Sequence, residues 1–329
     1  MSPRVACLPG DCIGPEVMAV AQRVLGVLTP DVELAEHLFG ADAIRQTGDS
    51  LPPDTLEACH SADAVLKAPI GHPEFDAADV RPEQGMLRLR AELDVYANLR
   101  PAREGAIDLV IVRELVGGLY FGARGVRDDG TVFDTCEYHP SQVERLARRG
   151  FELARTRGRK LTSVDKANVL ETSRLWRRVV RDVSADYPDV EVEDMLVDNA
   201  AMQLASAPEQ FNVVVTENMF GDILSDLAAA MTGGLGLAPS ASLGDRGPGI
   251  FEPVHGSAPD IAGRGIANPT GMLRSTVLML EHGLGRPAEA VALTQAVEGA
   301  LATTPTRDLG GTATTAEFSD AVVGALERT

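Results

Sequence analysis

The chain has 329 residues, of which 44% are hydrophobic and 24% charged, and its formal net charge at pH 7 is −18. This mixture predicts a globular protein of two ordinary domains or one large one, and the negative charge argues against nucleic acid, whose phosphates require a basic surface. No apolar run is long enough to cross a bilayer, and no signal-peptide core opens the chain. Four scattered cysteines are too few for a disulfide framework, so we expect a cytoplasmic protein.

Strand and helix candidates alternate along the chain, which is typical of an α/β fold with a largely parallel sheet. The strand Val5–Leu8 leads through a glycine turn into an amphipathic helix that ends near Val27, with Pro15 in its first turn. The chain contains no G-x-G-x-x-G motif and no P-loop, so this turn is interpreted as structural. The next candidate elements are Val32–Glu36, Pro53–Cys59, Ala64–Lys67, Glu83–Leu93 and Tyr96–Leu99.

Arginines follow in a narrow region of the sequence. Arg88 and Arg90 lie on the helix Glu83–Leu93, Arg100 comes soon after them, and Arg113 stands at the end of the apolar strand Leu109–Val112. Such arginines are usually solvated. Three of them that converge would form a clamp for carboxylates, because the guanidinium fork pairs with a carboxylate through two hydrogen bonds.

The middle of the chain places polar residues at the ends of strands. Lys166 follows the strand Leu161–Val164 and is either simply exposed or, in a crevice, a base with a tuned pKa. Asp198 falls at the carboxyl end of the strand Val192–Val197, where open α/β sheets hold their ligands. The other elements predicted here are a hairpin arm over Leu119–Glu137 and helices at Pro140–Arg155 and Leu175–Val183.

Asp222 and Asp226 lie four residues apart in a predicted helix from Met219 to Met231, so they share one helix face. Two neighbouring carboxylates form half of a site for Mg²⁺ or Mn²⁺. The alternative is that both merely solvate a surface helix. We favour the metal site, because the rest of that helix face is apolar and is expected to be packed. Its apolar residues are Met219, Ile223 and Ala230.

The stretch Phe251–Gly263 is rich in polar residues and glycine and is predicted to be a binding loop. It carries Asp260, and an aspartate on such a loop pairs with the free 2′-hydroxyl of NAD and repels a 2′-phosphate. Helices are then expected from Asn268 to Glu281, at Ala288–Ala302 and at Thr315–Glu327.

The motifs FEPVHGSAPDIAG and GDILSD, with RPEQGMLRLR, NLRPA and SVDKANVL, resemble those of the β-decarboxylating, metal-dependent hydroxyacid dehydrogenases, the isocitrate/isopropylmalate dehydrogenase family. The resemblance covers essentially the whole chain. It implies an α/β fold of two domains with a large mixed sheet flanked by helices, unlike a Rossmann fold. A large domain, residues 1–95 and 234–329, would hold the NAD-binding loop. The second domain, residues 96–233, would hold the arm and the dimer interface.

The resemblance also implies a role for each candidate residue, in a homodimer whose active site is shared between subunits. Lys166 of the partner would be the general base, and Tyr120 the acid that protonates the enol. Mg²⁺ or Mn²⁺ would be bound by Asp222, Asp226 and Asp198 of the partner. The substrate would contact Arg90, Arg100, Arg113, Glu83, Met86, Leu87 and Val169. The NAD cofactor would contact Ile13, Glu252, His255, Gly256, Ser257, Ala258, Asp260, Ile261 and Asn268.

The implied reaction is NAD-dependent oxidative decarboxylation of 3-isopropylmalate, as in leucine biosynthesis, because one acid and two apolar side chains suit an isopropyl group. The alternatives are the same chemistry on isocitrate, homoisocitrate, 3-methylmalate or another malate, or a non-catalytic partner subunit. Three features depart from the family pattern: Cys12 in the first glycine turn, the loop Lys67–Pro73, and a short connection at Ala102–Ile107.

Overall fold

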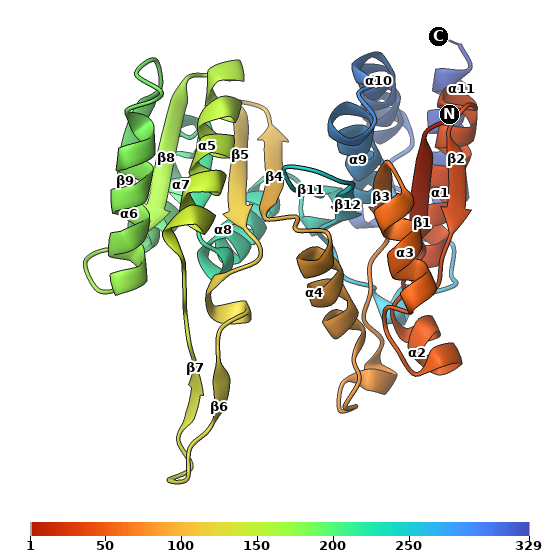
Figure 1. Ribbon diagram of the computed structural model, residues 1–329. Helices are drawn as coiled ribbons and strands as arrows, with labels where there is room; N and C mark the ends of the chain where they lie inside the picture. The colour runs from red at the N-terminus through yellow and green to blue at the C-terminus, as the bar shows by residue number, and fades with distance from the viewer. Residues whose placement is uncertain (1, 329) are drawn as a thin grey trace. The chain divides into compact units, whose positions relative to one another are not determined.

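The computed structural model describes residues 2–328 and divides into two compact units. Unit 1 comprises Met1–Asp94 and Leu235–Thr329, and unit 2 comprises Val95–Gly234. Each unit is an α/β structure in which helices flank a mixed sheet, so the predicted fold class is confirmed (Figure 1). Within residues 2–328, no helix combines the length and the apolar character that crossing a membrane requires.

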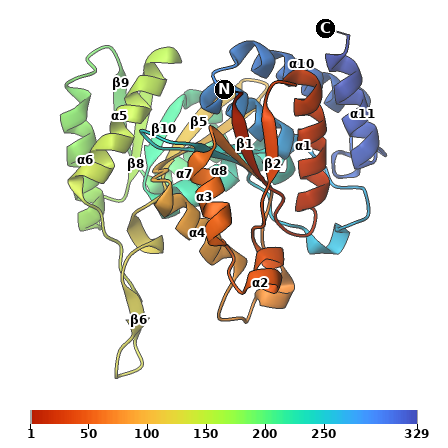
Figure 2. The same ribbon diagram turned by 45° about the vertical axis from the view of Figure 1, so that its right-hand side comes forward.

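The strands of unit 1 lie in the order β2-β1-β3-β12-β11, and only β11 runs antiparallel to its neighbour β12. They span Arg4–Leu8 (β1), Glu33–Glu36 (β2), Ala64–Lys67 (β3), Pro239–Leu243 (β11) and Gly249–Pro253 (β12). The helices are Gly14–Leu28 (α1), Ala41–Thr47 (α2), Pro53–Ser61 (α3), Pro82–Glu92 (α4), Thr270–Leu278 (α9), Pro287–Thr303 (α10) and Thr315–Leu326 (α11). Helices α1 and α9 to α11 cover one face of this sheet and α3 covers the other (Figure 2).

The sheet of unit 1 corrects one prediction. Phe251, Glu252 and Pro253, predicted to belong to a polar loop, lie in strand β12, and the loop begins after them. Ile250 and Phe251 are fully buried and pair with β3, which makes this short segment a strand. Glu252 is accommodated there because buried cations neutralise it, as described below.

The strands of unit 2 lie in the order β4-β5-β10-β8-β9, and only β4 is antiparallel to its neighbour β5. They span Ala97–Glu104 (β4), Ile107–Glu114 (β5), Lys160–Asp165 (β8), Glu191–Leu196 (β9) and Val213–Thr216 (β10). The helices are Pro140–Thr156 (α5), Glu171–Ser184 (α6), Val197–Ser206 (α7) and Asn218–Met231 (α8). Helices α5 and α6 lie on one face of the sheet, and α7 and α8 lie on the other (Figure 1).

A hairpin arm extends from the body of unit 2, as predicted, through the antiparallel pair Arg124–Val126 (β6) and Val132–Asp134 (β7) (Figure 1). Two predicted features of this unit are refined. The short connection at Ala102–Ile107 is a tight hairpin turn, because β4 continues to Glu104 and turns into β5 through Gly105 at φ +55°. Strand β9 ends at Leu196, one residue before its predicted end, and Asp198 follows this carboxyl end in the first turn of α7.

Candidate active site

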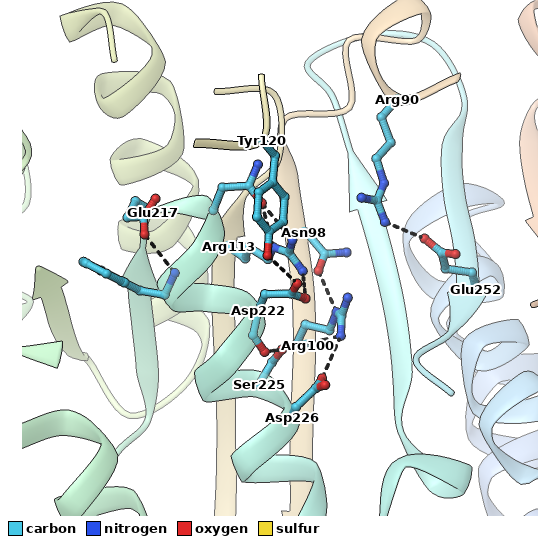
Figure 3. Close-up of polar contacts among 12 residues, drawn as sticks. Arg90, Asn98, Arg100, Arg113, Tyr120, Glu217, Asp222, Ser225, Asp226 and Glu252 are labelled. Atoms are coloured by element: carbon cyan, nitrogen blue, oxygen red, sulfur yellow. Dashed lines mark hydrogen bonds and ion pairs between the residues drawn. The ribbon is translucent and has the colours of Figure 1, made fainter. Parts of the chain in front are cut away.

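The two aspartates of α8 meet basic and phenolic side chains of unit 2 (Figure 3). Asp222 forms an ion pair with Arg113 and accepts a hydrogen bond on Oδ2 from the Tyr120 hydroxyl at 3.0 Å. Asp226 Oδ1 lies 3.7 Å from Arg100 Nη1. Two of the three predicted clamp arginines therefore converge on the acidic pair and supply its counter-charge within this chain.

The helix face that carries this pair is more open than predicted. Ile223 is 60% exposed, and Ala230 and Asp226 are exposed as well. The buried face of α8 runs through Leu224 and Ala228, which lie four residues apart and belong to the core of unit 2. The acidic pair thus lies at the edge of the packed face, within reach of a ligand.

Both arginines are held by side chains that sequence reasoning missed. Asn218 Oδ1, at the start of α8, accepts hydrogen bonds from Arg113 Nε at 3.0 Å and Nη2 at 2.8 Å. Asn98 Oδ1 accepts one from Arg100 Nε at 2.7 Å. Arg113 also stacks on the ring of Tyr120, with its guanidinium carbon 5.6 Å from the ring centroid. These contacts fix the direction of both guanidinium groups before any ligand binds.

The surroundings of this cluster raise the pKa values of Tyr120 and Asp226. Burial, assisted by the Asp222 carboxylate, raises the pKa of Tyr120, which keeps its hydroxyl protonated and able to donate. Burial also raises the pKa of Asp226, while the nearby Arg100 opposes that shift.

Lys166 and Asp198 form a separate pair in unit 2, with Lys166 Nζ 2.5 Å from Asp198 Oδ1. This hydrogen bond lowers the pKa of Asp198. Within residues 2–328, no three His, Cys, Asp or Glu side chains gather closely enough to hold a metal ion. A metal at Asp222 and Asp226 would therefore need further ligands from water, substrate or a second copy of the chain.

In unit 1, the first glycine turn is joined to two loops. The backbone N–H of Ile13 donates to the carbonyl of Ser257 at 3.1 Å, and Ser257 Oγ donates to the carbonyl of Gly71 at 2.6 Å. Cys12 adopts a left-handed conformation at φ +55°, and its thiol lies 3.7 Å from the same Gly71 carbonyl. Three predicted features, the turn, the loop Lys67–Pro73 and the loop after β12, thus form one structure.

His255 and Asn268 occupy the part of unit 1 predicted to bind NAD. Burial lowers the pKa of His255, and its Nδ1 lies 3.0 Å from the carbonyl of Gly256. His255 Nε2 is buried with no hydrogen-bond partner among the described residues. Asn268 Nδ2 donates to Asp308 Oδ2 at 2.9 Å, a partner that the sequence did not indicate. The remaining predicted cofactor residues lie on the exposed or half-buried stretch after this histidine: Gly256, Ala258, Asp260 and Ile261.

Arg90, the third predicted clamp arginine, lies on α4 in unit 1 and donates through Nη2 to Glu252 Oε1 at 3.1 Å (Figure 3). Its Nε is buried and has no hydrogen-bond partner among residues 2–328. Glu83 and Leu87 lie on the same helix at four-residue spacing, exposed and half-buried respectively, whereas Met86 is buried. Val169 is largely exposed on the loop after β8 of unit 2.

Comparison with known proteins identifies the architecture. A family model described as isocitrate/isopropylmalate dehydrogenase matches residues 4–322. The chain belongs to this family. The 3-isopropylmalate dehydrogenase of Zymomonas mobilis is 50% identical to it over 98% of this chain and 99% of that protein.

Two solved structures of related enzymes superpose on this chain along nearly its whole length. The isocitrate dehydrogenase of Methylococcus capsulatus superposes with a TM-score of 0.91 at 36% identity, over 98% of this chain and 99% of that one. The β-decarboxylating dehydrogenase of Thermococcus kodakarensis superposes with a TM-score of 0.86 at 40% identity, over 99% of this chain and 96% of that one. Membership of the family accounts for the absence of a dinucleotide-binding glycine fingerprint in an α/β chain.

Proposed function

We propose that this family member catalyses the NAD-dependent oxidative decarboxylation of 3-isopropylmalate to 4-methyl-2-oxopentanoate and CO₂, a step of leucine biosynthesis. The observation that carries the proposal is the cluster in which Asp222 meets both Arg113 and Tyr120. It combines a carboxylate for a metal, a cation for a substrate carboxylate and a protonated phenol. The similarity to a 3-isopropylmalate dehydrogenase along nearly the whole chain supports this substrate.

The arginines provide the binding step. A substituted malate carries two carboxylates, and a guanidinium fork binds each with directional, charge-assisted hydrogen bonds. Asn98 and Asn218 already hold Arg100 and Arg113, so little side-chain freedom remains to be lost on binding. Arg90 keeps a buried Nε ready for a further acceptor.

Lys166 and Tyr120 handle the protons. Two groups from outside the chain would complete the chemistry. The hydride from C2 would be accepted by NAD, and the C2 oxygen would be polarised by a divalent cation. Lys166 removes the proton of the C2 hydroxyl as hydride leaves that carbon. The oxidised acid is a β-keto acid and loses CO₂, and Tyr120, kept protonated by its raised pKa, returns a proton to C3 of the resulting enol.

The chain offers suitable groups for the cofactor and the metal. The carboxylates of Asp222 and Asp226 are the hard oxygen donors that Mg²⁺ and Mn²⁺ prefer. The orphaned Nε2 of His255 supports a ligand along the loop after β12. Asp260 on the same loop favours NAD over NADP, because its charge repels a 2′-phosphate.

We further propose a homodimer in which Lys166 and Asp198 of one copy complete the site of the other. Apolar side chains of unit 2 remain exposed on α7 and α8 and beside β8: Val169, Leu170, Met202 and Ile223. Such residues are expected at an interface between copies. The four cysteines are free, which suits the cytoplasm proposed for the enzyme.

The direct test is NADH formation by the purified protein with Mn²⁺ and NAD⁺, using 3-isopropylmalate, 3-methylmalate, malate, isocitrate and homoisocitrate in parallel. We expect a clear preference for 3-isopropylmalate, abolished by EDTA and by Lys166→Ala. Preference for another of these acids would leave the proposed mechanism standing and change only the proposed substrate. No turnover with any of the five would contradict the proposal and favour a non-catalytic partner subunit.

A further inference from the structure

The backbone of Lys166 is fixed on both sides. Its N–H donates to Ser173 Oγ at 3.0 Å, and its carbonyl accepts hydrogen bonds from the N–H groups of Val169 and Leu170 at 3.0 and 2.9 Å. Ser173 is buried in the first turn of α6. The direction in which the lysine side chain leaves the sheet is therefore set by its surroundings.

Asp165 adds a second restraint. Its side chain is only 1% exposed, and its Oδ1 accepts a hydrogen bond from the N–H of Ala167 at 2.9 Å, so that the carboxylate bridges across Lys166. This is a local turn closed by a side chain. A buried carboxylate is stable there only if a cation or further donors satisfy it.

Arg177 of α6 is that cation. Its Nε donates to Asp165 Oδ2 at 2.8 Å and its Nη2 donates to Oδ1 at 2.7 Å, a two-point fork that leaves the carboxylate one orientation. Arg177 and Ser173 lie four residues apart, on one face of α6. One helix face thus holds both Asp165 and the backbone N–H of Lys166.

We propose that Arg177 is a positioning residue for Lys166, acting through Asp165. The inference rests on the proposed function, in which Lys166 is the general base. Without the fork, the Asp165 carboxylate is free to rotate away from Ala167, and the turn around Lys166 loosens. Proton transfer depends steeply on the position of the base, whereas the arginines that bind the substrate are untouched. The proton-transfer step therefore weakens and substrate binding does not.

The experiment compares steady-state kinetics of the full-length enzyme and of Arg177→Ala, Arg177→Lys and Arg181→Ala. Arg181 is the matched control, because it lies one turn further along α6, is 62% exposed, and pairs through its guanidinium with Asp194 at 2.5 Å. We expect kcat to fall about 10–100-fold in Arg177→Ala, with KM for substrate and NAD unchanged within about twofold. Arg177→Lys, which keeps the charge but not the fork, is expected to fall between that variant and the wild type. Methylguanidinium is expected to restore part of the activity of Arg177→Ala, since the arginine it replaces is 27% exposed.

Wild-type kcat in a folded Arg177→Ala variant would overturn the inference, and so would an equal loss in Arg181→Ala or a loss that appears in KM alone. If Arg177→Ala does not fold, Arg177→Lys is the deciding variant. A wild-type kcat in Arg177→Lys would show that catalysis does not need the two-point contact between Arg177 and Asp165. The wild type and Lys166→Ala are measured first. An inactive wild type or an active Lys166→Ala would overturn the proposed function together with this inference, whereas an unaffected Arg177 variant overturns the inference alone.

Discussion

Lys67 Nζ lies 2.8 Å from Glu252 Oε2 inside unit 1, where the two side chains are 3% and 10% exposed. The other oxygen of Glu252 accepts a hydrogen bond from Arg90. One carboxylate on β12 therefore joins a lysine on β3 to an arginine on α4. Arg90, expected to bind substrate, is anchored through Glu252, expected to lie beside the cofactor, so the two predicted sites of this unit share one buried ion cluster.

Removing Lys67 leaves the Glu252 carboxylate with Arg90 as its one remaining cation in this cluster. We expect Lys67→Met to lower the free energy of unfolding by about 3–5 kcal/mol, because a buried carboxylate loses one of its two cations. Urea denaturation monitored by circular dichroism measures the change. Lys160→Met is the control, since Lys160 pairs with Glu193 at 3.3 Å in a more exposed position, and its loss is expected to cost at most about 1 kcal/mol. Equal losses in the two variants would show that burial of the Lys67 pair does not matter.

How far the sequence could predict this structure depended on the range of the interactions. The helix over Asn218–Met231 and the hairpin arm were found because their signals, helical periodicity and paired turn residues, are local. Helix α7 was missed because Asp198 was interpreted as the end of a strand, although an acidic residue in the first turn of a helix is also favourable. Strand β10, Val213–Thr216, was not predicted either, although the equally short strand β3 was.

The candidate site shows the same limit. The sequence indicated which residues carry charge, but the partners of those residues come from distant elements. Asn218 is 105 residues from Arg113, and Glu252 is 162 residues from Arg90. The exposure of Ile223 was also hidden, because periodicity shows that a helix has two faces and not what covers each.

Glu114 at the end of β5 makes stability depend on pH. Burial raises its pKa to about 7, although Val116 and Gly117 donate backbone hydrogen bonds to it and Arg145 opposes the shift. Because the pKa in the folded state lies above the unfolded value of 4.5, the native state binds this proton more tightly. Its stabilising effect is therefore fully present below pH 4.5 and is lost as the pH rises through 7.

The variant Glu114→Gln removes this titration. Between pH 4.5 and 8, wild-type stability is expected to fall by about 3 kcal/mol more than that of Glu114→Gln. Urea denaturation of both proteins at the two pH values gives the double difference, in which the cost of the substitution itself cancels. A parallel pH dependence of the two proteins would rule out Glu114 as the source.

Cys12 stores backbone strain in the first glycine turn. A residue with a Cβ is disfavoured at φ +55°, and glycine is not. We expect Cys12→Gly to raise the free energy of unfolding by up to about 1 kcal/mol, since the greater freedom of glycine in the unfolded chain offsets part of the relieved strain. Cys12→Ala keeps the strain and removes the thiol, so thermal unfolding should show no gain for it. A gain in both variants would assign the effect to the thiol.

Met202 on α7 tests the proposed dimer, because it is 58% exposed in unit 2 and lies on the helix that begins beside Asp198. A lysine in its place would carry a charge into an apolar contact between copies, so we expect Met202→Lys to be monomeric by light scattering after size exclusion. Turnover is expected to disappear with the dimer, because Lys166 and Asp198 then reach no second site.

Val291→Lys is the control, since Val291 is equally apolar and 57% exposed but lies on α10 of unit 1. If Met202→Lys remained a dimer, the interface would have to lie elsewhere. If it became a monomer with full activity, each chain would carry a complete site.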